Sequence, residues 1–265
     1  VHDLIPILYP PYVTPFYAWQ TKVFLPNALK KASIIFSVSH STKNDIIRKY
    51  KIDPEKIWVS PNGVSDHFRP ASPTEIQSFC KKQNLNNPFI LFVGAIEPKK
   101  NIPTIIKAFY IVRRDNPGLE LVIAGKKSWK YKGVFELVHS LKLDESVRFL
   151  DFVPYQDLPI LYSAASVFVF PSNYEGFGLP PLEAMKCGTP VIVSNRSSLP
   201  EIVGPLGHMI EPDDYKDLSI KIKKFLDDDC MRSEHISYNL ERASEFTWAR
   251  CAEETKKGYD KALNM

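Results

Sequence analysis

The 265-residue sequence has no long apolar run, no paired cysteines and no marked excess of one charge. Charges and prolines break every apolar run well before the roughly 20 residues that a membrane-spanning helix needs. Its four cysteines lie far apart without a Cys-x-x-Cys, which argues against a disulfide framework or a zinc site and favours reduced cytoplasmic thiols. The net charge of +4 arises from 34 basic and 30 acidic residues, too even a mixture for a nucleic-acid-binding face.

Apolar residues make up 44% of the sequence, with 16 Phe and 12 Tyr, which is enough for a packed core. Short β-branched runs alternate with segments of helical period. The pattern predicts strands over 34–39, 57–60, 89–93, 120–124, 147–149, 167–170 and 191–194. Helices are expected over 42–50, 74–83, 101–115, 134–141, 156–165, 181–186, 199–203, 215–226, 230–246 and 249–263. This alternation is typical of an α/β fold with parallel sheets, in which ligands bind beyond the carboxyl ends of the strands.

A polar, proline-bearing stretch over 68–88 is the best place for a domain boundary. We therefore predict a partial N-terminal domain over 1–70 and a C-terminal domain over 71–248. A last helix over 249–265 is expected to pack back on the first domain. The chain opens on Val1, inside a strand-like segment, and we interpret it as a piece of a longer protein.

The most informative segment is 170–185, in which a buried strand leads into a glycine-bearing loop, then prolines, then a helix. Gly176 and Gly178 let the backbone approach a ligand, and the helix start presents N–H groups with partial positive charge. Such an arrangement binds phosphate. Glu175 and Glu183, eight positions apart, flank it, and carboxylates accept hydrogen bonds from the hydroxyls of a polyol.

This segment resembles the Glu-x7-Glu signature of glycosyltransferase family 4, whose members are retaining enzymes of the GT-B fold that use nucleotide-sugar donors. The resemblance implies two Rossmann-like domains with parallel sheets, the N-terminal one incomplete here. It also implies that Glu175 contacts the donor sugar and Glu183 the ribose. The family's diphosphate- and sugar-binding amides match Gly176, Phe177, Gly178 and Leu179.

A second loop, over 93–101, resembles the family's first strand-loop of the C-terminal domain. The diphosphate-binding lysine of that loop maps to Lys100, next to Gly94. The usual arginine is replaced by Ala95, so one cation is missing, and we expect Lys99 to compensate. Two lysines just before a helix and after a buried strand form an anion site on physical grounds alone.

Two further positions follow from the resemblance. The loop over 149–154 resembles the one that packs on the nucleobase through backbone groups near Val153. His2 matches a family histidine of the N-terminal domain that lies near the reacting sugar. With Glu175 and Lys100, His2 completes the set of residues predicted to be catalytic.

The resemblance implies transfer of a hexose, for which we favour mannose, from GDP-mannose or a UDP-sugar to a glycan or lipid-linked saccharide in surface-polysaccharide synthesis. The expected mechanism is front-face displacement with no enzyme nucleophile, no cofactor and no metal. Asp227–Asp229 contains a formal Asp-x-Asp metal motif, but its place after an amphipathic helix favours a solvated helix end. The expected location is the cytoplasm, or peripherally at the inner membrane face.

Two other functions compete with this one. A glycoside hydrolase also needs two carboxylates, but eight helical residues separate two α-carbons by about 12 Å, against about 5–9.5 Å between hydrolase carboxyl groups. A nucleotide-sugar-binding fragment without turnover is the second alternative. Aromatic and basic residues between Tyr9 and Lys31 fit either peripheral membrane contact or a buried helix with lysines along its edges.

Overall fold

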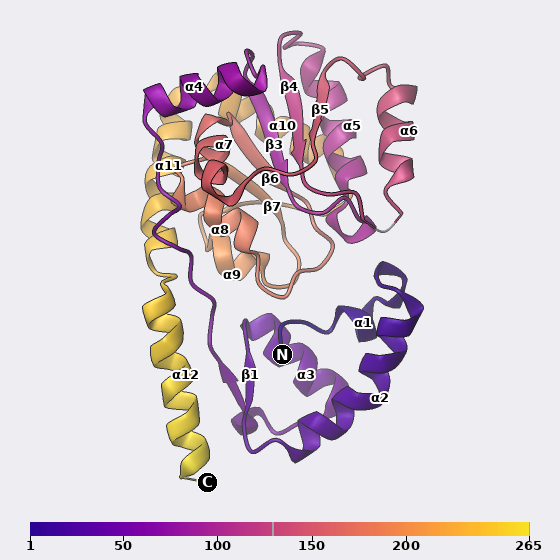
Figure 1. Cartoon of the computed structure of the whole chain (residues 1–265), viewed down its shortest axis with the longest axis vertical. Helices are drawn as coiled ribbons and strands as arrows, with labels where there is room; N and C mark the ends of the chain where they lie inside the picture. Colours follow the sequence, from indigo (N-terminus) through magenta and orange to yellow (C-terminus); the bar gives the residue numbers. More distant parts are fainter. Residues whose placement is uncertain (129, 265) are drawn as a thin grey trace.

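The computed structural model describes residues 1–128 and 130–264, which form two lobes (Figure 1). The first lobe contains α1 (Ile5–Leu8), α2 (Pro15–Lys31), β1 (Ile35–Ser37), α3 (His40–Tyr50) and β2 (Ile57–Val59). The second begins with α4 (Pro73–Gln83), β3 (Phe89–Val93), α5 (Ile102–Arg113), β4 (Glu120–Ala124), α6 (Lys132–Ser140), β5 (Val147–Leu150), α7 (Leu158–Ala164) and β6 (Val167–Phe170). It continues with α8 (Leu179–Lys186), β7 (Val191–Ser194), α9 (Leu199–Val203), β8 (His208–Ile210), α10 (Tyr215–Asp227) and α11 (Asp229–Ser244). The last helix is α12 (Trp248–Leu263).

The sheet of the second lobe is parallel throughout the described residues, with the strand order β5-β4-β3-β6-β7-β8. Every residue of β6 and β7 is buried, because helices cover both faces of the sheet. The order runs outward from β3 on one side and from β6 on the other, so the topology switches between these two strands. The predicted α/β class is therefore confirmed.

The first lobe has a core of its own, separate from that of the second. Its parallel pair β1-β2 is covered by α3, and the buried side chains are Leu4, Leu29, Ile35, Ile46, Ile52 and Ile57. In the described residues this sheet has two strands, in agreement with a Rossmann-like domain that is represented only in part.

The last two helices link the lobes (yellow in Figure 1). Helix α11 packs on the second lobe, where the Asn239 amide donates to the carbonyl of Thr189. Helix α12 runs beside the first lobe. A Cβ at Gly258 would lie 2.3 Å from the ring of Phe36, so only glycine permits this close approach. The domain boundaries drawn from the sequence remain predictions.

Several local expectations were wrong. Helix α3 begins at His40, capped by Ser39, whereas the capping-box spacing placed its start at Thr42. Helix α8 begins at Leu179, two residues before the predicted start, because prolines fit a first helical turn. Strand β8 was not predicted, since its sequence His-Met-Ile contains a single β-branched residue. The Asp-rich segment 227–229 was expected to be a helix end, and here Asp228 caps the start of α11 by accepting from the N–H of Met231 at 2.8 Å.

Helix α2 is largely exposed, and the interpretation of 9–31 as a buried helix is wrong. Within it only Leu29 is buried, whereas the side chains of Phe16, Trp19 and Phe24 are more than half exposed. Membrane contact by this surface stays a prediction. Among the described residues, no helix has the length and apolar character to cross a membrane.

Candidate active site

Two loops meet where the sheet topology switches. Lys99 and Lys100 lie in a 3₁₀ turn after β3, and Ser172 follows β6, the strand next to β3. The loops are tied together because the carbonyl of Lys99 accepts from the backbone N–H of Asn173 at 2.8 Å and from the Ser172 hydroxyl at 3.0 Å. Ligands of open parallel sheets bind at this position.

Glu175 is a buried, ionised carboxylate at this junction. Its Oε1 lies 2.6 Å from Lys100 Nζ and accepts from Ser172 Oγ at 2.5 Å, while Oε2 lies 3.9 Å from Lys99 Nζ. Burial alone would raise the pKa of Glu175, but attraction to Lys100 and then Lys99 outweighs it and holds the pKa below its ordinary value. The carboxylate therefore stays charged and held in one orientation, ready to accept hydrogen bonds from a polyol.

Lys99 supplies a positive charge without a tight partner. Burial would lower its pKa, but attraction to Glu175 and Glu97 raises it above the ordinary value. The closest carboxylate oxygen, on Glu97, lies 3.5 Å from Nζ. The ammonium group thus lies between two carboxylates, 3.5 Å from Glu97 and 3.9 Å from Glu175, and an incoming anion would share it with them.

The segment between the two predicted glutamates presents free backbone donors. The N–H groups of Gly176, Phe177 and Gly178 donate no hydrogen bond within the described part of the chain, although all three residues are buried. Gly178 has φ +122°, a conformation that favours glycine, and it caps α8. Unpaired amides at a helix start form an anion site, because the helix dipole adds partial positive charge there.

Glu183 lies within α8, half-buried, and accepts a hydrogen bond from the hydroxyl of Tyr162 at 2.8 Å. Burial raises its pKa, partly offset by that hydrogen bond. Glu183 and Glu175 thus have opposite pKa shifts, since only Glu175 has lysine partners. The assignment of Glu183 to ribose binding stays a prediction.

A pocket of about 240 Å³ opens between the lobes beside Glu175. It is lined by His2, Asp3, Val38, Asn62, Glu175, Gly176, Phe177, Gly178, Leu179 and Pro180. The structure thus brings His2 together with Glu175 and the amide segment. A Cβ at Gly176 would lie 2.1 Å from the carbonyl oxygen of His2, so a glycine is required where the lobes touch.

The remaining predicted site residues lie at the same edge of the sheet but do not line this pocket. Gly94 directly follows β3 with φ +154°, and a Cβ there would lie 3.8 Å from the Cε of Lys100. Ala95 and Val153 are half-buried, in the loops that follow β3 and β5. Their predicted roles toward the diphosphate and the base remain predictions.

The structure also reveals supporting residues that the sequence interpretation missed. Ser172 binds Glu175 directly, and Ser197 Oγ accepts from the backbone N–H of Glu175 at 2.8 Å. Ser198 donates to the carbonyl of Glu175 at 3.0 Å and also to that of Phe177. Ser172 had a local signal, as a polar residue directly after a buried strand. The two later serines had none, because their loop follows a different strand, β7.

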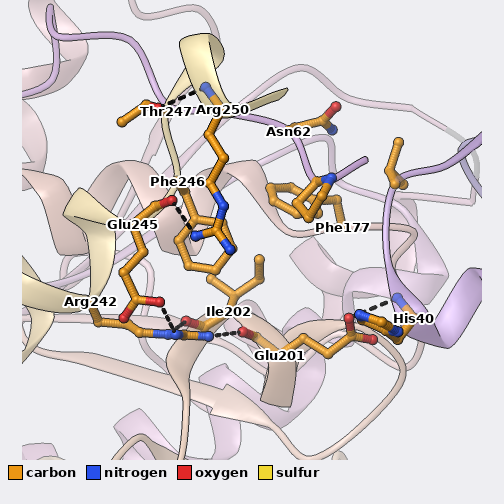
Figure 2. A pocket seen from close by; sticks show the side chains of 12 residues that line it. His40, Asn62, Phe177, Glu201, Ile202, Arg242, Glu245, Phe246, Thr247 and Arg250 are labelled. Carbon is orange, nitrogen blue, oxygen red and sulfur yellow. Dashed lines mark hydrogen bonds and ion pairs between the residues drawn. The ribbon is translucent and has the colours of Figure 1, made fainter. Parts of the chain in front are cut away.

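Figure 2 shows a second pocket between the lobes, of about 320 Å³, at the start of α12. Phe177 and Asn62 line both pockets. Here Arg242 pairs with Glu245 at 2.7 Å, and Arg250 donates to the Glu245 carbonyl at 3.1 Å. The charges of this pocket are thus largely engaged within the protein.

Two family models divide most of the chain between them. The model described as Glycosyl transferases group 1 matches residues 74–242, which is more than half of the chain. The chain belongs to the group 1 glycosyl transferases. A second model, described as Glycosyltransferase Family 4, matches residues 1–68 of this transferase chain. The family resemblance drawn from the sequence is confirmed.

Curated relatives of this transferase include bacterial mannosyltransferases. It is 34% identical over 260 residues to the O-antigen chain mannosyltransferase B of Escherichia coli, covering 97% of this chain and 68% of that protein. It is 33% identical over 273 residues to the serotype-specific mannosyltransferase WbdA of Escherichia coli, of which the chain spans only 33%. The similarity to these named transferases does not favour the hydrolase or the binding-only alternative.

Solved structures establish the fold. The Anabaena protein Alr3699/HepE, in complex with UDP and glucose, superposes with a TM-score of 0.83 at 22% identity over 100% of this chain and 70% of that one. Sucrose-phosphate synthase from Thermosynechococcus elongatus gives a TM-score of 0.81 at 24% identity over 98% and 65%. The predicted GT-B architecture of this transferase is therefore confirmed.

Proposed function

We propose that this transferase moves mannose, with retention, from a nucleotide-diphosphate sugar such as GDP-mannose to a glycan or lipid-linked saccharide during surface-polysaccharide synthesis. One observation carries the proposal: the ionised, buried Glu175 lies beside unpaired amides and two lysines at the topological switch of the sheet. The similarity to proteins named as O-antigen mannosyltransferases supports both the sugar and the class of acceptor.

Each part of this arrangement has a chemical task in the proposed reaction. The amides of Gly176–Gly178 and the ammonium groups of Lys99 and Lys100 stabilise charge on the departing diphosphate, where preorganised donors act most strongly. Glu175 orients the sugar through its hydroxyls. His2, at the rim of the same pocket, contacts the sugar from the first lobe. These groups neutralise the leaving group without a resident metal ion in our proposal.

The first experiment screens donors by calorimetry and by transfer. We expect GDP-mannose to bind more tightly than UDP-glucose, and mannosyl transfer to a saccharide acceptor to persist in excess EDTA. Transfer from a UDP-sugar only would reassign the donor. Loss of transfer with EDTA, restored by Mg²⁺, would refute the metal-independent mechanism.

A second experiment separates the two glutamates. Glu183→Ala should weaken free nucleoside diphosphate binding about tenfold or more, the effect of losing a hydrogen bond to a charged group. Glu175→Ala should chiefly reduce transfer. Glu136→Ala, which removes an exposed glutamate of α6, is the matched control. Equal loss of nucleotide affinity in the first two variants would contradict this division of roles.

A further inference from the structure

The first lobe holds the residue that precedes Glu175. The hydroxyl of Tyr174 donates to Asp45 Oδ2 at 2.5 Å across the lobe boundary. Both side chains are buried, with Tyr174 4% and Asp45 6% exposed. Asp45 lies on α3, and its other oxygen, Oδ1, is held by Arg48 at 2.6 Å. A tyrosine hydroxyl is thus bound to a charged, fixed acceptor of the opposite lobe.

The residue that follows Glu175 is held from the same helix. The Ser39 hydroxyl donates to the carbonyl of Gly176 at 2.8 Å. Nearby, the carboxylate of Glu201 accepts from the backbone N–H groups of His40 at 2.8 Å and Ser41 at 2.6 Å, as Figure 2 shows for His40. Residues at the start of α3 therefore hold the residues on both sides of Glu175. They also bind Glu201 on α9.

The partners of the Glu175 side chain, by contrast, all belong to the second lobe. Lys100 and Ser172 orient the carboxylate, whereas Tyr174 and Gly176 fix the backbone that carries it. Separation of the lobes would break the contacts of Tyr174 and Gly176 with the first lobe. The contacts of the Glu175 carboxylate, and those of Ser197 and Ser198 with the Glu175 backbone, would stay in place. The first lobe therefore holds the residues on either side of Glu175, whereas the second lobe holds Glu175 itself.

We propose that Asp45 and Tyr174 are positioning residues that place Glu175 against the donor sugar only when the two lobes are together. The proposal rests on the transferase function given above. A buried hydrogen bond to a charged group changes an equilibrium by about 10-fold or more. The pair is therefore strong enough to set the population of correctly placed Glu175.

The kinetic test compares Tyr174→Phe with the parent chain and with Tyr238→Phe, a control that removes a hydroxyl bonded to the Val203 carbonyl within the second lobe instead of across the lobe boundary. For Tyr174→Phe we expect kcat to fall about tenfold, with donor KM and nucleoside diphosphate affinity within about twofold. Lys99 and Lys100 lie on the loop after β3 rather than on the segment that Tyr174 holds, so they should retain most of the ground-state affinity even if the amides of Gly176–Gly178 loosen. Asp45→Asn, which keeps an acceptor oxygen, should retain most of the activity that Asp45→Ala loses.

A second measurement does not require turnover. Hydrogen–deuterium exchange of peptides covering 172–179 should be faster in Tyr174→Phe and Asp45→Ala, and unchanged in Tyr238→Phe. Unchanged exchange in this segment, or a proportional rise in KM at constant kcat, would overturn the proposal. If the parent chain transfers no sugar from any donor, the proposed function fails, while the exchange data still decide whether the pair positions the segment.

Discussion

Removal of the Lys100 charge tests the electrostatics of the site without reference to any substrate. Lys100 Nζ lies 2.6 Å from Glu175 Oε1, and the two residues are only 8% and 9% exposed. The variant Lys100→Met keeps an unbranched chain of similar length but removes the ammonium group, which lies 4.7 Å from the centroid of the Phe170 ring. What the variant loses is the close counter-charge of a buried carboxylate.

The size of the effect follows from what remains around Glu175. Removing one partner of a buried ion pair typically costs about 3–5 kcal/mol. Ser172 still donates to the carboxylate and Lys99 stays 3.9 Å away, so we expect the lower end, about 3 kcal/mol of unfolding free energy. The double variant Lys100→Met/Glu175→Gln should recover most of this loss, because the uncompensated charge is gone.

The effect of pH on the unfolding free energy has a defined sign. In the parent chain the pKa of Glu175 is lowered, so its contribution to stability is present above the ordinary carboxyl pKa and is lost as pH falls through the lowered value. In Lys100→Met burial dominates and raises the pKa. Protonation then relieves the buried charge, and the stability gap between variant and parent should narrow as pH falls toward about 5.

Urea unfolding followed by fluorescence, at pH 7.5 and at pH 5, measures both effects. Lys107→Met is the matched control, because Lys107 is an exposed lysine on α5, and it should change stability by less than about 0.5 kcal/mol. A cost for Lys100→Met below about 1 kcal/mol, or a double variant less stable than the single one, would refute a buried, ionised Glu175.

Two further predictions concern stability. Burial, followed by the charge of His208, lowers the pKa of His235 from 6.5 to about 4. The stability present above pH 6.5 should therefore fall by about 3 kcal/mol as the pH falls toward 4. In urea unfolding at several pH values, His235→Phe should reduce this dependence of stability on pH, and an unchanged dependence would contradict the prediction. Gly125→Ala should lower the unfolding free energy by more than about 2 kcal/mol, because the new Cβ would lie 2.0 Å from the Gly94 carbonyl oxygen. The control Gly118→Ala, where a Cβ meets open space, should leave the unfolding free energy nearly unchanged in the same assay.

The second lobe was largely predictable from the sequence because its signals are local. The runs that form β3, β4 and β6 are short, apolar and β-branched or aromatic, and each is followed by a helix of clear period. Such alternation implies a parallel sheet, and a parallel sheet places the loops after its strands at one edge. The segment that carries Glu175 combined a strand end, glycines and prolines within 16 residues, so an anion site could be predicted there.

The contacts within the site were decided by tertiary structure. Lys100 meets Glu175 across 75 positions because β3 and β6 are neighbours in the sheet, and strand order leaves no mark in a local pattern. Tyr174 meets Asp45 across 129 positions because the two lobes pack against each other. The exposure of α2 was likewise not readable from its composition.

The sequence by itself therefore determined most elements of the second lobe, its parallel sheet and the residue types of the predicted anion site, since those depend on backbone preference and hydrophobic period. Packing between distant segments decided which lysine pairs with Glu175. It also decided which lobe holds the residues on either side of Glu175. Ion pairs and buried hydrogen bonds form only after the chain has brought such segments together.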